Sequence, residues 1–259
     1  MRRQLGYMAA AAALAAIALA GVAIASDQAV VVRAGKMVLR LNGGVTPKAL
    51  PRYTFAPLGF HARGSLATTD GSHPPALGEA EFDVDKDVEV DVEGLPSCRL
   101  SDLQARDTKA AKGACADAIL GTGSATVEVA FPEQAPFLAS GPLILFNGGE
   151  QGGEIKLLAY TYVAVPAPTA VVTTATLTRE HKGPFGLHSV VKVPRIAGGA
   201  GSVVSASLKA RRVYTYRGRR HSFLSGRCRD GRIQARGTFR YLDGSVLSGA
   251  IVRACTTAD

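Results

Sequence analysis

The 259-residue sequence has no tryptophan, and aromatic residues make up only 6% of it. Ligand clefts are commonly lined by aromatic rings, so this scarcity argues against a carbohydrate-processing cleft. The sequence also lacks the G-x-S-x-G, H-E-x-x-H and phosphate-loop motifs of common enzyme families. It therefore offers no catalytic residue and leans away from an enzyme.

Patterns for metals and nucleic acids are equally scarce. The four cysteines contain no C-x-x-C pair, which disfavours a zinc site of the usual kind. No RNA-binding signature or helix-turn-helix pattern is present, so we expect no specific nucleic-acid partner. No two histidines have metal-ligand spacing on one predicted element, and we expect no metal and no cofactor. The histidines are His61, His73, His181, His188 and His221.

The N-terminus has the three parts of a secretory signal peptide. Met1-Arg2-Arg3 is positively charged, residues 8–20 form an uncharged alanine-rich run, and Ala23-Ile24-Ala25 is an A-x-A cleavage site. We predict cleavage before Ser26 and a secreted or extracytoplasmic protein with no transmembrane span in the mature chain. The alternative is an uncleaved N-terminal anchor, because the uncharged run approaches bilayer-spanning length.

Four cysteines that follow a signal peptide predict a disulfide framework. Three pairings are open, and closeness in sequence favours Cys98–Cys115 and Cys228–Cys255. The alternative for the first pair is two buried free thiols.

The last predicted hairpin constrains the second pair. A turn centred on Asp243-Gly244 sets Cys255 opposite about Arg232. A bridge from Cys255 to Cys228 therefore requires a bulge, a small register shift or a return of the segment before the hairpin.

Residues 95–123 are the only mature stretch with a helical pattern. Thr108 is a candidate cap for its longer helix, and Gly121 is expected to stop it. Closing the Cys98–Cys115 loop would stabilise this insert, about residues 99–120, by about 3 kcal/mol. The expected buried face carries Ala111, Cys115 and Ala118.

Short runs in the middle of the chain carry a family resemblance: GLPSC at 94–98, CADA at 115–118, GTG at 121–123, DGSHPP at 70–75 and FNG at 146–148. They resemble an uncharacterised family of exported proteins from high-GC Gram-positive bacteria. The resemblance covers about residues 40–255 and implies export and a β-rich fold. Since no activity is assigned to that family, it carries no catalytic residue to this chain.

The rest of the mature chain consists of short β-rich runs between Gly, Pro and Asp-Gly turns. This pattern predicts a mainly β, antiparallel, sandwich-like architecture with a small helical insert. We expect a signal peptide (1–25), an N-terminal segment (26–36), a β-rich lobe with the insert (37–165) and a basic β-rich lobe (166–259). Residues 37–259 could equally form one domain. The predicted strands are 37–41, 58–68, 125–131, 143–146, 155–165, 169–178, 187–194, 203–208, 212–217, 233–241 and 246–255.

Charge is distributed unevenly along the chain. Residues 166–259 hold 16 Lys and Arg against 4 Asp and Glu, a net charge of +12. Residues 26–165 hold 12 basic and 17 acidic residues, a net charge of −5. The acidic part is densest at residues 83–93, where six carboxylates share one parity. As one strand, this segment presents a solvated acidic face or, less plausibly, a calcium site; as a hairpin turning at 85–87, it divides the carboxylates between two strands.

The basic part is densest at residues 209–221. Basic and aromatic side chains on a sheet can hold a polyanion, and export directs attention to anionic envelope polymers or acidic lipid surfaces. The alternatives are a solvated outer face and a face that docks on the acidic part. The candidate ligand-binding residues are Lys209, Arg211, Arg212, Tyr214, Tyr216, Arg217, Arg219 and Arg220.

These features together favour a non-catalytic binding or structural module of the cell envelope, with salt-sensitive contacts at the basic segment. The rival function is an extracellular hydrolase whose site is assembled from distant loops. A deep pocket that gathers His61, His73 or the acidic segment would favour the hydrolase.

Overall fold

The computed structural model describes residues 28–164 and 167–258. The predicted signal peptide, its cleavage site and the alternative membrane anchor lie outside these residues. The described chain is mainly β and antiparallel and contains one α-helix, which confirms the predicted fold class. No helix among the described residues is long and apolar enough to cross a membrane.

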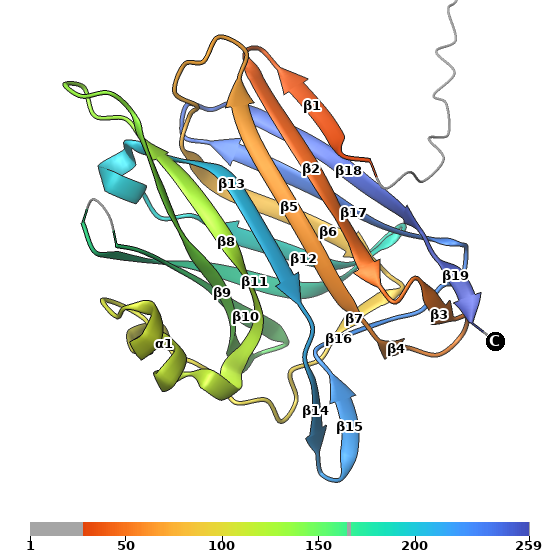
Figure 1. The fold of residues 1–259 in the computed structure, drawn as a ribbon. Helices are drawn as coiled ribbons and strands as arrows, with labels where there is room; N and C mark the ends of the chain where they lie inside the picture. Colours follow the sequence, from red (N-terminus) through yellow and green to blue (C-terminus); the bar gives the residue numbers. More distant parts are fainter. Residues whose placement is uncertain (1–27, 165–166, 259) are drawn as a thin grey trace, which may run out of the picture.

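Twelve strands form one large sheet in which all neighbours are antiparallel (Figure 1). Across the sheet the strands are β1 (Val30–Ala34), β2 (Met37–Thr46), β5 (Gly59–Thr68), β13 (Gly201–Ala210), β8 (Ile119–Val129), β9 (Phe137–Gln151), β10 (Glu154–Val163), β11 (Thr169–Lys182), β12 (Phe185–Lys192), β6 (Leu77–Asp85), β17 (Arg232–Tyr241) and β18 (Val246–Ala254).

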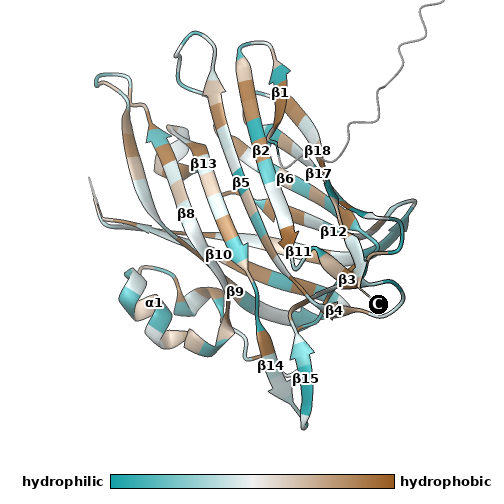
Figure 2. Ribbon diagram, turned by 45° about the vertical axis from the view of Figure 1, so that its right-hand side comes forward, coloured by the Kyte–Doolittle hydropathy of each residue, from teal (hydrophilic) through white to brown (hydrophobic). Residues whose placement is uncertain are grey.

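The sheet interleaves strands from both sides of Pro166. β13 lies between β5 and β8, and β17 lies beside β6. Hydrophobic and hydrophilic residues alternate along many of the strands (Figure 2), as expected for strands with one face on a core. The buried residues Leu145, Leu187 and Ile233, from widely separated strands, belong to one hydrophobic cluster.

The large sheet curls until its two edge strands, β1 and β18, approach each other (Figure 1). A Cβ atom on Gly249 of β18 would lie 2.9 Å from Cγ2 of Val32 in β1, so this close approach requires glycine. The sheet is thus nearly closed, with a seam between β1, β2 and β18.

Arg253 fills the seam next to the residues that precede β1. Its side chain is 7% exposed, and its Nε donates to the carbonyl of Gly43 at 2.6 Å. Its Nη2 donates to the carbonyl of Gln28 at 3.2 Å and to Oδ1 of Asn42 at 3.3 Å. The β1–β2 ladder stops at Leu41, so Arg253 satisfies backbone oxygens that lie beyond the ladder.

Three small sheets gather at one end of the large sheet (Figure 1). β14 (Val213–Tyr216) and β15 (Arg219–Ser222) form a hairpin that projects from this end. The other two sheets are β4 (Ala56–Pro57), β16 (Leu224–Gly226) and β7 (Val88–Val90), and the parallel pair β3 (Ala49–Pro51) and β19 (Thr256–Ala258).

The helical insert covers the outer face of the large sheet. It contains η1 (Leu100–Asp102), α1 (Thr108–Ala114) and η2 (Ala116–Ala118), and it packs on the buried rings of Phe146 and Tyr160. The predicted Cys98–Cys115 disulfide is present. As expected, the buried residues of the insert include Ala111, Cys115 and Ala118.

Two local predictions in the insert were wrong. The cap of α1 is Asp107, whose Oδ1 accepts from the amide of Ala110 at 2.7 Å; Thr108 is the first helical residue. Gly121 does not stop the helix, because it already lies in β8. A Cβ atom there would lie 2.5 Å from the carbonyl oxygen of Lys209, so Gly121 permits β8 and β13 to pack closely.

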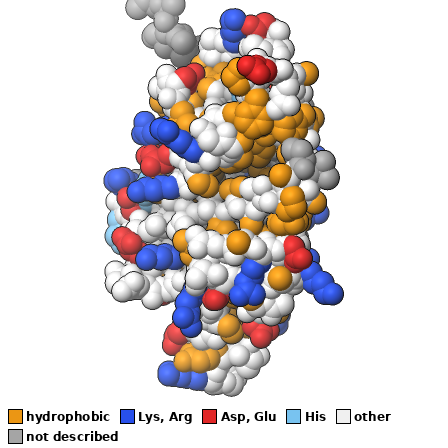
Figure 3. Space-filling view, turned by 90° about the vertical axis from the view of Figure 1, so that its left-hand side faces the viewer, with side chains coloured by type: hydrophobic (Ala, Val, Ile, Leu, Met, Phe, Trp, Pro, Cys, Tyr) orange, Lys and Arg blue, Asp and Glu red, His pale blue; other side chains and the backbone are white. Residues whose placement is uncertain are grey.

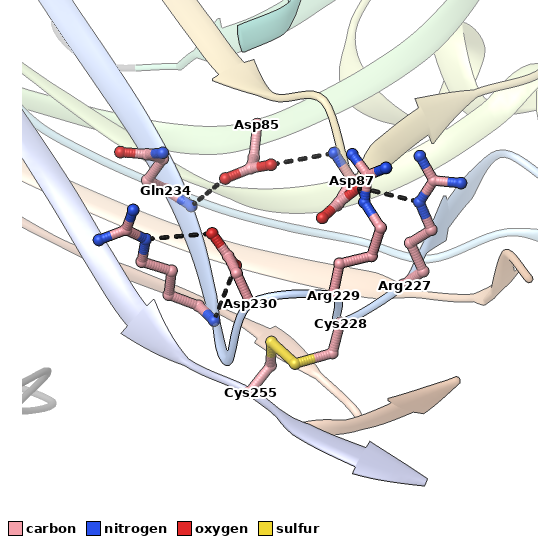
Figure 4. Close-up of a disulfide and its surroundings, with 9 residues drawn as sticks. Asp85, Asp87, Arg227, Cys228, Arg229, Asp230, Gln234 and Cys255 are labelled. Carbon is pink, nitrogen blue, oxygen red and sulfur yellow. Dashed lines mark hydrogen bonds and ion pairs between the residues drawn. A yellow bond between two sulfur atoms is a disulfide. The ribbon is translucent and has the colours of Figure 1, made fainter. Parts of the chain in front are cut away.

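The second predicted disulfide, Cys228–Cys255, is also present (Figure 4). β17 and β18 pair with Arg232 opposite Ala254, and the amide of Cys255 donates to the carbonyl of Gly231 at 3.0 Å. The segment before β17 therefore turns back and brings Cys228 to Cys255. The described residues contain no free cysteine.

The turn between β17 and β18 forms as predicted, over Asp243, Gly244 and Ser245. Gly244 has φ +86, a left-handed conformation that favours glycine. Oδ1 of Asp243 accepts from the amide of Ser245 at 2.9 Å, which explains why an aspartate precedes the glycine.

Candidate functional site

The acidic segment 83–93 does not form one strand. β6 ends at Asp85, the chain turns over Lys86 and Asp87, and β7 continues in a different sheet. The six carboxylates are therefore divided between elements. Three of them meet cationic or histidine partners from the second half of the chain instead of forming a solvated face.

Asp83 and Asp87 are the centres of these contacts. Arg236 lies 2.6 Å and His188 lies 2.9 Å from the carboxylate of Asp83. Burial alone would raise the pKa of Asp83, but hydrogen bonds from His188 and Arg236 outweigh it and lower the pKa. These contacts form an internal ion-pair network that joins β6 to β12 and β17.

Asp87 is buried, and Arg227 and Arg229 each lie 2.8 Å from its Oδ1 (Figure 4). Its neighbour Asp85 accepts hydrogen bonds from the amides of Asp87 and Gln234. Burial raises the pKa of Asp85 because no cation pairs with it among the described residues. These aspartates join β6 to the start of β17 next to the Cys228–Cys255 bridge.

One group on this side has the composition of a metal site. Ligand atoms of Asp83, Glu180 and His188 lie within 4.8 Å of one another. Two cations already contact the carboxylates, since Arg236 binds Asp83 and Nζ of Lys182 lies 3.1 Å from Glu180. Positive neighbours oppose a second cation, so we interpret the group as part of the ion-pair network.

The predicted basic segment lies at the end of the large sheet from which the hairpin projects. Lys209 is near the end of β13, Arg211 and Arg212 form the link to the hairpin, and Arg217 occupies its tip. β15, which carries Arg219 and Arg220, is strongly hydrophilic (Figure 2). The structure thus brings all the predicted basic residues to one end of the molecule.

The exposed arginines of this segment differ from those on β17 in their ion pairing. Arg236 and Arg240 of β17 pair with carboxylates of β6. Among the described residues, no carboxylate forms an ion pair with the exposed side chains at the base and tip of the hairpin. These are Arg211, Arg217, Arg219 and Arg220.

The two predicted tyrosines hold the hairpin in place. The ring of Tyr214 stacks on His221 at 5.4 Å, and its hydroxyl donates to the carbonyl of Glu93 at 2.8 Å. Burial, with the charges of Asp91 and Glu93, raises the pKa of Tyr214 to about 12. Tyr216 packs against Gly94, where a Cβ atom would lie 2.2 Å from the ring. Both rings therefore contact the loop at 91–94.

A hollow of about 650 Å³ lies at the root of the hairpin. Its cationic or ionisable side chains are His61 of β5, Lys209 of β13, and Arg211 and Arg212 of the link. A second hollow, of about 520 Å³, shares Thr46 and His61 with the first and is lined by Lys48 and Arg253. No described carboxylate lines either hollow.

Arg212 has an unusual environment within the first hollow. Its Nη2 donates to the carbonyl of Asp117 at 3.4 Å. Its Nε is the one buried side-chain nitrogen or oxygen without a hydrogen-bond partner in the described part of the chain. Buried polar groups normally have partners, so this nitrogen marks a position that a bound acceptor would satisfy.

The sequence identified Lys209 through Arg220 and named His61 as a possible pocket residue, but it did not indicate Thr46 or Arg253. Only the folded sheet places Thr46 of β2 and His61 of β5 beside Lys209, and Arg253 of β18 in the second hollow. No local signal could have found them.

A chain of hydrogen bonds at the opposite end of β13 links three polar side chains that are common in hydrolases. Nδ1 of His73 lies 2.7 Å from Oε1 of Glu128, and its Nε2 lies 3.0 Å from Oγ of Ser202. Ser202 is 0% exposed, and its hydroxyl donates to the carbonyl of Pro74. A buried serine engaged in this way fastens the loop at 69–76 to β8 and β13.

The side of the molecule at the left of Figure 1 has a different character. Figure 3 shows that hydrophobic side chains gather on its upper part. Exposed large hydrophobic residues of the chain include Phe131 and Leu138, at the connection between β8 and β9. This apolar area and the basic hairpin are separate surfaces.

Comparisons of the chain with protein-family models, curated proteins and solved structures find no match. Functional interpretation therefore rests on the geometry of the described residues.

Proposed function

We propose that this protein is an exported, non-catalytic binding module of the cell envelope that holds anionic polymers. The ligand surface comprises the tip of the β14–β15 hairpin and the hollow at its root, and we call it the basic surface. It contains Lys209, Arg211, Arg212, Arg217, Arg219 and Arg220, with His61 at its edge.

The observation that carries the proposal is the contrast between two sets of arginines. Those on β17 and next to Cys228 are neutralised by Asp83, Asp87 and Glu81. On the basic surface, Arg211, Arg217, Arg219 and Arg220 are exposed, and none of its arginines forms an ion pair with a described carboxylate. Their positive potential is therefore available to attract a polyanion from solution.

The shape of this surface supports contact with a chain-like ligand. A projecting hairpin carries three arginines, and a concave hollow follows at its root. Tyr214, Tyr216 and His221 contact Glu93, Gly94 and Asp91, and they fix the hairpin to the body of the protein, so binding does not have to order it. Rigid presentation reduces the entropy that association costs.

Two disulfides are compatible with an extracellular protein, because such bridges persist in oxidising compartments. With the predicted signal peptide and the family resemblance, they support a secreted or extracytoplasmic location. The anionic polymers of that environment include phosphate-rich, teichoic-type chains, which we take as the partner. Acidic lipid surfaces are the alternative partner, and the experiment below distinguishes the two.

The test is equilibrium binding of Ser26–Asp259 to isolated envelope polymers. A hairpin variant carries Arg217→Asn, Arg219→Gln and Arg220→Gln; asparagine is chosen at 217 because φ there is +49. A control variant carries Arg33→Gln, Lys192→Gln and Arg195→Gln, three exposed cations without ion pairs to described residues elsewhere on the protein.

We expect the hairpin variant to bind at least about tenfold more weakly than the control variant, although the two have the same net charge. Equal binding by the two variants would show that only total charge matters and would refute a localised surface. Vesicles of phosphatidylglycerol form the second arm. Tighter binding to vesicles than to polymer would contradict the choice of partner.

One observation favours the rival function, an extracellular hydrolase: the hydrogen-bonded chain of Ser202, His73 and Glu128. Catalysis there would require the loop at 69–76 to move, because Ser202 is 0% exposed. A fluorophosphonate probe tests this directly. Labelling of Ser202 that is lost in His73→Gln would support a hydrolase, whereas an unlabelled folded protein would leave the trio as a fastening for the loop.

A further inference from the structure

We infer that the hollow at the root of the hairpin is a seat for a single phosphate group, and that Arg212, Lys209 and His61, which line it, are the residues that hold the phosphate. The inference rests on the proposed function, because it names the group of the anionic polymer that this part of the basic surface receives. It goes further because it assigns recognition of that group to residues at the root of the hairpin and not at its tip.

The unsatisfied Nε of Arg212 is the first support. Its backbone is fixed, since its carbonyl accepts from the amide of Phe223 at 2.8 Å and from the hydroxyl of Ser222 at 3.4 Å. Its Nη2 is held by the carbonyl of Asp117. The guanidinium is thus positioned in advance, with one buried N–H left for an acceptor.

The charge around the hollow is the second support. Lys209, Arg211 and Arg212 line it, and no described carboxylate does. Neighbouring Arg253 is buried and bonds only to neutral oxygens among the described residues. Buried and half-buried cations with no counter-charge produce a positive potential inside a concave site, which concentrates anions there.

Glycines keep the hollow open. A Cβ atom on Gly44 would lie 3.0 Å from the ring of His61, and one on Gly59 would lie 3.2 Å from Cβ of Arg211. Larger residues at either position would displace side chains that line the hollow. The open space, of about 650 Å³, exceeds what one phosphate needs and accommodates the adjoining parts of a polymer.

The donor arrangement favours phosphate over carboxylate. One of the five N–H donors of the Arg212 guanidinium contacts the carbonyl of Asp117, and its Nε–H has no partner among the described residues. The other basic side chains that line the hollow lie on β5, β13 and the link, so the donors come from separate elements. A tetrahedral oxyanion offers oxygens in several directions and suits such a set.

Inorganic phosphate is the probe, titrated by calorimetry against Ser26–Asp259 at constant ionic strength. We expect saturable binding of one phosphate, about tenfold weaker in Arg212→Gln and several-fold weaker in Lys209→Gln. The matched control, Arg33→Gln, removes one exposed cation on β1, outside the basic surface, and should bind within about twofold of the native protein. Acetate at the same concentrations should not compete.

Arg212→Gln can also disturb the structure of the link between β13 and β14. Lys209→Gln alters an exposed side chain, so weaker phosphate binding in that variant reports on the hollow itself. No saturable phosphate binding, or equal weakening by Arg33→Gln, would overturn the seat. If glycerol phosphate competes with inorganic phosphate and phosphatidylglycerol vesicles do not, the natural ligand is a polymer phosphate. The reverse result would contradict a polymer source.

The two proposals fail separately. If phosphate binding is absent but the hairpin variant still loses polymer binding, the proposed function stands and the seat is wrong. If phosphate binds through Arg212 but the hairpin variant keeps its polymer binding, the seat stands and the proposed role of the hairpin is wrong.

Discussion

At the scale of single residues, Asp87 illustrates how the acidic segment is used. Its carboxylate is buried between Arg227 and Arg229, with each Nε 2.8 Å from Oδ1. Removing one partner of a buried ion pair leaves the other charge uncompensated, which is more costly than losing an exposed pair. The segment that looks like a solvated strand face is therefore partly a structural anchor.

Asp87→Asn should lower the free energy of unfolding by about 3 kcal/mol, because it leaves both arginines facing a neutral amide. Urea denaturation followed by circular dichroism measures this change. The control is Asp230→Asn, in which an exposed aspartate loses its pair with Arg232; we expect less than about 1 kcal/mol there. Equal effects would show that burial of Asp87 contributes little.

Two tyrosines should make the protein sensitive to alkali. Burial raises the pKa of Tyr214 and that of Tyr241 to about 12, against about 10 in an unfolded chain. The folded state holds these protons more tightly, so the unfolded state loses them first as pH rises. Stability should be retained below about pH 10 and fall between about pH 10 and 12.

Tyr214→Phe tests this dependence. The variant loses the hydrogen bond to Glu93 and should be less stable at neutral pH, but its stability should fall less steeply above about pH 10. Denaturation curves at a series of alkaline pH values give the slopes. Parallel slopes for the two proteins would contradict the burial of the Tyr214 hydroxyl.

At the scale of secondary-structure elements, the β14–β15 hairpin depends on its seat against the loop at 91–94. Its turn residues, Arg217 and Gly218, have φ values of +49 and +73, as a tight two-residue hairpin turn requires. Tyr216 lies over Gly94, which itself has φ +75. The position therefore needs glycine for both conformation and space.

Gly94→Ala should destabilise the protein by about 2–3 kcal/mol, from left-handed strain together with a clash on the Tyr216 ring. The matched control is Gly218→Ala, which has a similar φ but open space around the added Cβ and should cost only about 1 kcal/mol. Chemical denaturation measures both. A difference near zero would mean that Tyr216 does not pack on Gly94.

Sequence patterns predicted elements best where short-range chemistry decides the structure. Examples are the stapled insert with buried Ala111 and Cys115, and the Asp243-Gly244 turn. They could not decide the structure where partners are distant. The alternation at 83–93 allowed either one strand or a turn at 85–87, and the structure divides the segment between β6 and β7, with Asp87 paired to arginines 140 or more residues away. Periodicity contains no information about such partners.

At the scale of the whole molecule, the sequence could not show that twelve strands curl into one nearly closed sheet. Closure depends on long-range contacts at the seam, where Gly249 lets β18 approach β1 and Arg253 bonds to the backbone beyond Leu41. The same closure places Arg253 beside His61. The candidate hollows therefore follow from the topology and not from any local motif.

Arg253→Met should open the seam, because the backbone oxygens of Gly43 and Gln28 lose a charged donor. We expect a loss of about 2–3 kcal/mol and faster amide exchange in β1 and β18 than in β9 and β10. Arg253→Lys retains one donor and should show a smaller effect. Uniformly faster exchange throughout the sheet would contradict a local role at the seam.

The measurement that tests the central claim most directly is the salt dependence of polymer binding by the native protein, the hairpin variant and the control variant. We expect the logarithm of the affinity to fall steeply with the logarithm of the salt concentration for the native and control proteins. For the hairpin variant the slope should be smaller by roughly 2, as expected when three phosphate contacts are lost. Identical slopes for all three proteins would contradict the claim that function resides on the basic surface.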